Sequence, residues 1–149
     1  MASTDHAVDV LNGLIKTTLD SVGGYKDAAD SANNSHFKGM FAERAMKREQ
    51  LARDLQEEVR ALGGDPQEHQ GFLGKAHNEF VNLKAALTGN DDKAVIDEVE
   101  RGEDRIKEKF EDALEDNDLP PSVRAKVARA CESIKADHDE VSRIKRTLH

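Results

Sequence analysis

Apolar residues recur every three or four positions along most of this 149-residue chain. Such spacing marks one face of an α-helix, whereas a half-buried strand would alternate strictly, which no segment does. The pattern therefore predicts an all-α protein. The expected helices span residues 5–32, 37–62, 72–87, 92–116 and 122–148.

Turn-forming residues mark the ends of these helices. Residues 3–5, Ser-Thr-Asp, are N-cap candidates for the first helix, and Asp91 or Asp92 for the fourth. Residues 63–66, Gly-Gly-Asp-Pro, combine a glycine stop with a proline that cannot continue the second helix. Two prolines at 120–121 separate the fourth and fifth helices. Each predicted boundary therefore has a local cause.

The expected core follows from the inward face of each helix. Its predicted members are Val8, Leu11, Ile15, Val22, Tyr25, Ala29, Phe41, Ala45, Leu55, Val59, Leu62, Leu73, His77, Phe80, Leu83, Leu87, Val95, Val99, Ile106, Phe110, Leu114, Val123, Val127, Cys131, Ile134, His138, Val141 and Leu148. Neighbouring residues compete for three further positions, which fall on Thr18 or Leu19, Leu51 or Ala52, and Gly102 or Glu103.

Gly23 and Gly24 lie in the middle of the first predicted helix. A glycine inside a helix costs about 1 kcal/mol relative to alanine. The pair either lets another helix approach closely or marks a kink, and we favour close packing.

Four of the helices have matched lengths of roughly 25 residues, about 40 Å at 1.5 Å per residue. Short turns join the first to the second and the fourth to the fifth, which predicts two antiparallel hairpins. The connection between them holds the short helix 72–87. This is the topology of a ferritin-like antiparallel four-helix bundle with a short helix in the crossover. We expect a single domain over residues 1–149.

Composition and charge limit the possible partners. The net charge of −8 repels nucleic-acid phosphates and anionic lipid headgroups, so neither nucleic acid nor a membrane is expected as a partner. No stretch approaches the length of a transmembrane helix, and no signal peptide is recognised. A single cysteine, Cys131, fits a reducing compartment. We therefore expect a cytoplasmic protein.

Several segments resemble a known family. They are residues 20–29 (DSVGGYKDAA), 55–66 (LQEEVRALGGDP) and 98–114 (EVERGEDRIKEKFEDAL). They are similar to bacterial ferritin-like domains of unknown function, which are small four-helix-bundle relatives of the rubrerythrins. The resemblance implies the fold and suggests a role in stress physiology. It implies little about activity, because a fold does not fix a function.

Ferritin-like di-iron sites need one glutamate from each of two helices and a Glu-x-x-His pair from each of the others. By the resemblance, Glu103 stands at one glutamate position, seven residues before Phe110. Thr18 stands at the other, seven residues before Tyr25. One of the two glutamates is therefore missing.

The Glu-x-x-His positions of the second helix hold Arg48 and Leu51, and those of the fifth hold Lys135 and His138. Cationic side chains repel a metal ion, so we expect no di-iron site and no cofactor. The alternative is a carboxylate and histidine site for iron or manganese. Its candidate ligands are Glu103, His138 and His77.

The remaining candidates have simpler explanations. His77 and His138 lie on apolar lines, where a histidine is usually a hydrogen-bonded core residue. Cys131 has no basic neighbour clearly placed to activate it and is interpreted as a small hydrophobic residue. No phosphate-binding loop, dinucleotide fingerprint, zinc-ligand pair or nucleophile elbow is present.

Arg48 lies seven residues after Phe41 and seven before Leu55, so the spacing draws it toward the bundle interior. We expect it either to form a buried ion pair with Glu103 or to extend along the core to water. The leading hypothesis is a non-catalytic bundle that associates with itself or with another protein. A homodimer is expected, formed through a small-residue face that includes Gly23, Gly24 and Ala28.

Overall fold

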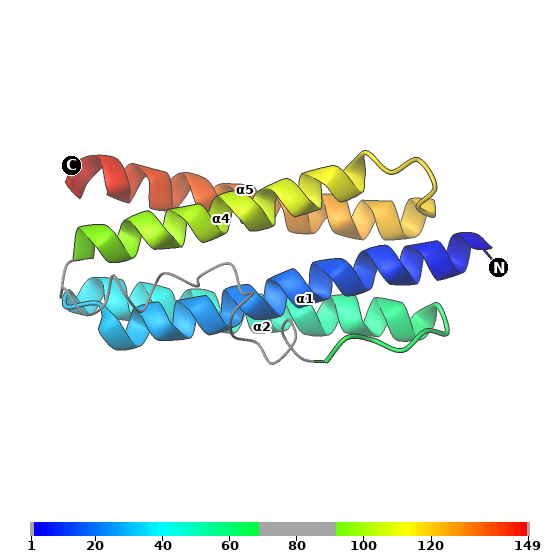
Figure 1. The fold of residues 1–149 in the computed structure, drawn as a ribbon, viewed down its shortest axis with the longest axis horizontal. Coiled ribbons are helices and arrows are strands. Elements are labelled where there is room, and N and C mark those ends of the chain that lie inside the picture. Colours follow the sequence, from blue (N-terminus) through cyan, green and yellow to red (C-terminus); the bar gives the residue numbers. More distant parts are fainter. Residues whose placement is uncertain (1, 69–91, 149) are drawn as a thin grey trace.

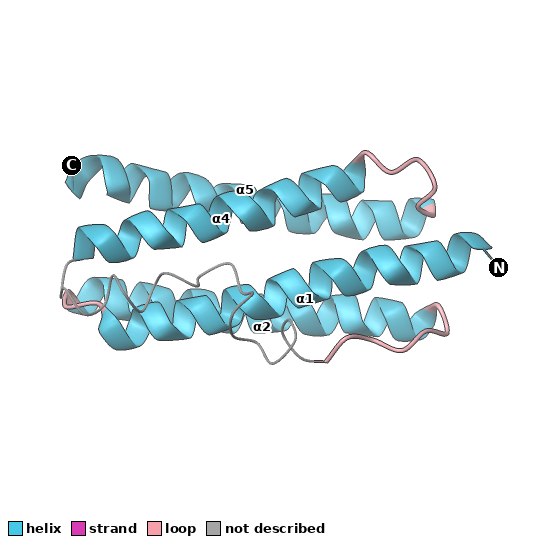
Figure 2. Ribbon diagram, in the orientation of Figure 1, coloured by secondary structure: helices cyan, strands magenta, loops and turns pink. Residues whose placement is uncertain are grey.

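The structure is a computed structural model that describes residues 2–68 and 92–148. Its described residues form four helices and no strand (Figure 2). The helices are α1 (Ala2–Ser31), α2 (Ser35–Ala61), α4 (Asp92–Leu114) and α5 (Pro121–Leu148). The predicted all-α class is confirmed. The helix predicted over 72–87 and its candidate His77 lie outside the described residues.

The four helices lie along one common long axis (Figure 1). Helices α1 and α2 run side by side in opposite directions, and so do α4 and α5. Helix α1 also packs against α4. The N-terminal end of α1 and the α4–α5 connection lie at the same end of the molecule (Figure 1). None of the described helices has an apolar stretch that would cross a lipid bilayer.

Most of the predicted boundaries hold within a few residues, and the exception is the N-cap at residues 3–5. Helix α1 already begins at Ala2, so these residues lie in its first turn, where an acidic side chain such as Asp5 complements the helix dipole. The helix continues through Gly23 and Gly24 without interruption. Helix α2 is capped by Asn34, whose side chain accepts hydrogen bonds from the next backbone N–H groups.

The carboxylate of Asp92, at the start of α4, connects the two hairpins. It accepts hydrogen bonds from the backbone N–H groups of Asn33 (2.8 Å) and Asn34 (3.1 Å) in the α1–α2 turn. The start of α4 is thereby held against the far end of the first hairpin.

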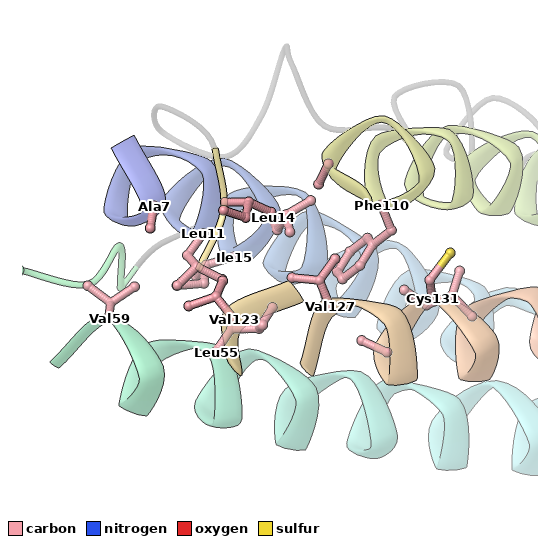
Figure 3. Close-up of a cluster of buried hydrophobic side chains, with 14 of the residues drawn as sticks. Ala7, Leu11, Leu14, Ile15, Leu55, Val59, Phe110, Val123, Val127 and Cys131 are labelled. Carbon is pink, nitrogen blue, oxygen red and sulfur yellow. The ribbon is translucent and has the colours of Figure 1, made fainter. Parts of the chain in front are cut away.

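Two hydrophobic clusters form the core. The proximal cluster, nearest the N-terminus, contains Leu11 and Ile15 of α1, Leu55 of α2, Phe110 of α4 and Val123 of α5 (Figure 3). The distal cluster is Tyr25, Ala28, Ala32, Phe37, Phe41, Ala45, Val95, Ile96, Val99 and Val141. In each helix the residues of one cluster precede those of the other, so the clusters lie at successive heights along the bundle.

Most of the small-residue face that was expected to form a dimer is buried inside the bundle. Ala28 is fully buried in the distal cluster, and Gly24 is buried as well. Gly24 and Ala28 are therefore not available for a dimer contact, because they lie inside the bundle, and Gly23 is half-buried.

Candidate functional site

A layer of buried polar side chains separates the two hydrophobic clusters. It contains Ser21 of α1, Arg48 of α2, Glu103 of α4 and Asp137 of α5, and we call these four residues the central layer. Each of them lies in sequence between the proximal and the distal residues of its own helix. All four helices thus contribute one polar side chain at the same height.

Arg48 connects the other three residues of the central layer. Its Nη1 donates to the Ser21 hydroxyl (2.7 Å), and its Nη2 donates to Glu103 Oε2 (2.8 Å) and to Asp137 Oδ2 (3.2 Å). Arg48 is 1 % exposed and Glu103 is 0 % exposed. The ion pair that the spacing suggested between Arg48 and Glu103 is present, and it is fully buried.

Asp137 extends this network toward the surface. Lys47 Nζ donates to Asp137 Oδ1 at 2.9 Å, and Arg44 Nε lies 3.6 Å from the same oxygen. Arg44 also pairs with the half-exposed Glu140. Three cations therefore face three anions, counting Arg48 and Glu103 of the interior, and the network is balanced in charge.

Tyr25 lies at the edge of the central layer, beside two guanidinium groups. The Cζ atoms of Arg44 and Arg48 lie 5.7 and 5.6 Å from its ring centroid, within range of cation–π attraction. Its hydroxyl accepts a hydrogen bond from Arg44 (3.3 Å). Burial, followed by the charge of Glu103, raises the pKa of Tyr25 well above its ordinary value, although both arginines oppose this. The phenol is neutral at physiological pH.

Both arginines keep their proton and their positive charge. Burial alone would lower the pKa of Arg48, but the charge of Glu103 raises it above its ordinary value. The pKa of Arg44 is also raised despite burial, through Tyr25 and Asp137. Neither guanidinium can exchange a proton near neutral pH, so neither is suited to general acid or base catalysis.

Glu103 depends on Arg48 for its stability in the core. Its Oε1 atom is buried and accepts no hydrogen bond from the residues that the structure describes. A buried carboxylate with one unsatisfied oxygen is costly, and the paired cation offsets this cost.

The structure separates the candidate metal ligands. Glu103 lies in the interior with Arg48, whereas His138 is half-buried at the surface, with Nε2 2.5 Å from Asp104 Oδ1. Lys135, placed inward by the resemblance, is exposed. The buried residues with this spacing are Ile134 and Asp137, one residue earlier than Lys135 and His138, so the ligand register assumed for the fifth helix was wrong.

The side chains of the central layer do not fit a pair of metal ions. They supply two carboxylates, and both are bonded to cations, whereas a ferritin-like site needs six inward ligands. At the equivalent position of α1, Thr18 donates its hydroxyl to the carbonyl of Leu14 (2.7 Å). Arg48 bonds to both of these carboxylates, and its charge opposes a metal ion beside them.

Three buried residues of the network were not predicted: Ser21, Arg44 and Asp137. Ser21 and Arg44 directly precede the predicted core residues Val22 and Ala45, and a helix face is wide enough to include such neighbours. Asp137 had a stronger indication, since it lies three residues after Ile134 and four before Val141.

A protein-family model matches most of the chain. The model of a family described as a domain of unknown function, DUF2383, matches residues 6–116. The match covers α1, α2 and α4 and stops before α5. None of the curated proteins compared with the chain matches it.

Proposed function

We propose that this chain, which belongs to the DUF2383 family of domains of unknown function, is a non-catalytic ferritin-like helical bundle that acts by association. The first partner that we propose is a second copy of the same chain. A role in stress physiology rests on the resemblance alone and remains part of this hypothesis.

The chemistry of the central layer supports a non-catalytic role. Its carboxylates are neutralised by guanidinium groups, and the adjoining Tyr25 is neutral. Both described carboxylates of the layer are bonded to a cation, so neither is free to act as a nucleophile or a base. The layer is better suited to fixing the alignment of four helices than to transforming a substrate.

The observation that carries the association hypothesis is an open groove between α2 and α5. Three adjoining hollows lie between these helices, with volumes of about 1010, 440 and 520 Å³. The largest is lined by the outer part of the charge network, including Arg44, Lys47 and Asp137. We call these hollows together the α2–α5 groove.

The charges along this groove are complementary to those of a second copy. Near one end, acidic Glu57 and Glu58 of α2 lie opposite basic Lys126 and Arg129 of α5, and Lys126 pairs with Glu58 at 3.0 Å. A two-fold axis parallel to the helices would place α2 of one copy beside α5 of the other at the same height. Acidic residues of one copy would then meet basic residues of its partner.

The signs reverse farther along the groove. There the net charge of α2 is positive, from Arg44 and Lys47 against Glu43. That of α5 is negative, from Asp137, Asp139 and Glu140 against Arg143. A copy shifted along the axis would bring like charges together, which favours a single register of this parallel arrangement.

Light scattering tests the proposal. We expect a mass near twice the 16.5 kDa of one chain at high micromolar concentration. Arg129→Glu should shift the protein toward monomer, because the new acidic side chain on α5 of each copy then faces the acidic segment of α2 of the other copy. The matched control is Lys109→Glu, the same change of charge at an exposed position of α4, which should leave the mass unchanged.

A charge swap identifies the surface. Arg129→Glu combined with Glu57→Arg restores opposite charges across the two-fold axis, so it should restore the dimer. A mass of one chain for the unmodified protein at every concentration would overturn self-association. A dimer unaffected by Arg129→Glu would place the contact elsewhere.

A further inference from the structure

A second group of charged side chains lies at the end of the bundle that carries the N-terminus. His6 belongs to α1, whereas Asp116 and Asp118 belong to the connection between α4 and α5, and Figure 1 shows these two segments at the same end of the molecule. This group is separate from the central layer and from the α2–α5 groove.

The three side chains converge although they come from distant parts of the chain. His6 Nε2 lies 2.5 Å from Asp116 Oδ2. One ligand atom from each of His6, Asp116 and Asp118 lies within 4.8 Å of the other two. Among the described residues, this is the one group of three potential ligands that meets so closely.

The connection is held in a defined conformation around these carboxylates. Asp116 Oδ1 accepts the backbone N–H of Asp118 (2.9 Å). The guanidinium of Arg124 donates to the carbonyls of Leu114 (2.5 Å) and Asp116. Arg124 therefore orders this turn through its carbonyls, and its positive charge also acts on Asp116.

An imidazole nitrogen combined with two carboxylate oxygens matches the preferences of borderline divalent ions. Such ions bind three protein ligands readily and keep one position open for water. The two carboxylates balance a charge of +2, and the carbonyl end of α4 adds negative potential. The side chains of His6 and Asp116 are 42 % and 22 % exposed, so an ion reaches them from solvent.

We propose that His6, Asp116 and Asp118 bind one divalent ion of the zinc class. The ion binds between His6 and Asp116 and replaces the hydrogen bond between them. It fastens the first turns of α1 to the α4–α5 connection, which joins the two hairpins at this end. Ion binding then stabilises the bundle, since the unfolded chain does not hold these three ligands together.

His138 provides a matched comparison within the same chain. Its Nε2 lies 2.5 Å from Asp104, while its Nδ1 lies 3.3 Å from Asp139. The two carboxylates therefore approach opposite edges of the ring and cannot bind one ion together with a single nitrogen. His138 has the composition of the proposed site without its geometry.

Titration of the full chain with Zn²⁺ against a chromophoric chelator tests the proposal. We expect one ion per chain whose affinity falls at least about tenfold in His6→Gln and in Asp118→Asn. His138→Gln should bind as the unmodified chain does. Zn²⁺ should raise the melting temperature of the unmodified chain and of His138→Gln, but not of His6→Gln.

Other outcomes would overturn the site. The proposal fails if the chain binds no Zn²⁺, or if His6→Gln and Asp118→Asn bind it with unchanged affinity. Displacement of Zn²⁺ by an equal concentration of Ca²⁺ would also reject it, because the imidazole would then contribute nothing. The substituted side chains are at least partly exposed, so circular dichroism should show each variant folded.

Discussion

At the scale of single residues, Arg48 is the side chain on which the interior depends most. It bonds to three residues from three other helices and is itself almost fully buried. Arg48→Met leaves Glu103 without its cation and should lower the free energy of unfolding by about 3–5 kcal/mol. Adding Glu103→Leu should recover much of this loss, because the orphaned carboxylate is then gone. Denaturant unfolding of the two single variants and the double variant measures the coupling.

A suitable control is Arg53→Met, the same substitution at an exposed position of α2. It should change stability by no more than about 0.5 kcal/mol. Strictly additive effects of Arg48→Met and Glu103→Leu would show that the buried pair has no energetic coupling.

Glu100 gives the stability a defined dependence on pH. Partial burial would raise the pKa of its carboxyl, but hydrogen bonds from Ser142 (2.6 Å) and Lys145 (2.9 Å) lower it below the ordinary value of 4.5. A lowered pKa in the folded state stabilises the protein above the unfolded pKa, and this contribution is lost as the pH falls. Glu100→Gln should therefore be less stable than the unmodified chain at pH 7.

The difference in stability between Glu100→Gln and the unmodified chain should shrink as the pH falls below 4.5. It should vanish below the lowered pKa of Glu100. Thermal unfolding of both proteins between neutral and acidic pH measures it. Glu108→Gln, at an exposed position of the same helix, serves as the control. A difference that stays constant with pH would mean that ionisation of Glu100 does not stabilise the fold.

At the scale of elements, the end of α2 is defined by two glycines with different roles. Gly63 has a φ of +83°, a backbone conformation that favours glycine. Gly64 donates its N–H to the carbonyl of Val59 (3.0 Å), and a Cβ at Gly64 would lie 2.7 Å from a methyl group of Val8. The glycine stop therefore also lets the chain pass close to the start of α1.

Gly64→Ala should destabilise the bundle by about 1–3 kcal/mol, as overpacking does, because the branched side chain of Val8 has little freedom to move away. Part of this cost should disappear when Val8→Ala is the background, since the clashing methyl groups are then absent. Denaturant unfolding of the four proteins of this cycle is the measurement. An equal cost in both backgrounds would show that Val8 does not cause it.

At the scale of the whole molecule, the central layer predicts the metal content of the protein. A bundle whose middle is filled by Arg48 and its carboxylates should be isolated without a pair of iron or manganese ions. Elemental analysis of protein purified without chelator is the measurement. About two such ions per chain would contradict the prediction. A single zinc bound at His6 would not.

The sequence by itself determined the four helices of the described residues, because apolar spacing and turn residues act locally. Even the inward position of Arg48 followed from its spacing to Phe41 and Leu55. The sequence did not determine which face of α5 points into the bundle. Successive residues of a helix are about 100° apart, so Asp137 and His138 lie on either side of its apolar line, and both have acceptable spacing.

Only tertiary packing distinguished these two side chains. Arg48 of α2 offers Asp137 a cation in the interior, whereas His138 finds a carboxylate at the surface. The tertiary structure also decided that Ala28 faces the core. It brought His6 within 2.5 Å of Asp116, although 110 residues separate them in sequence. The local patterns around His6 and Asp116 carry no information about their contact, because it exists only after the two hairpins have packed together.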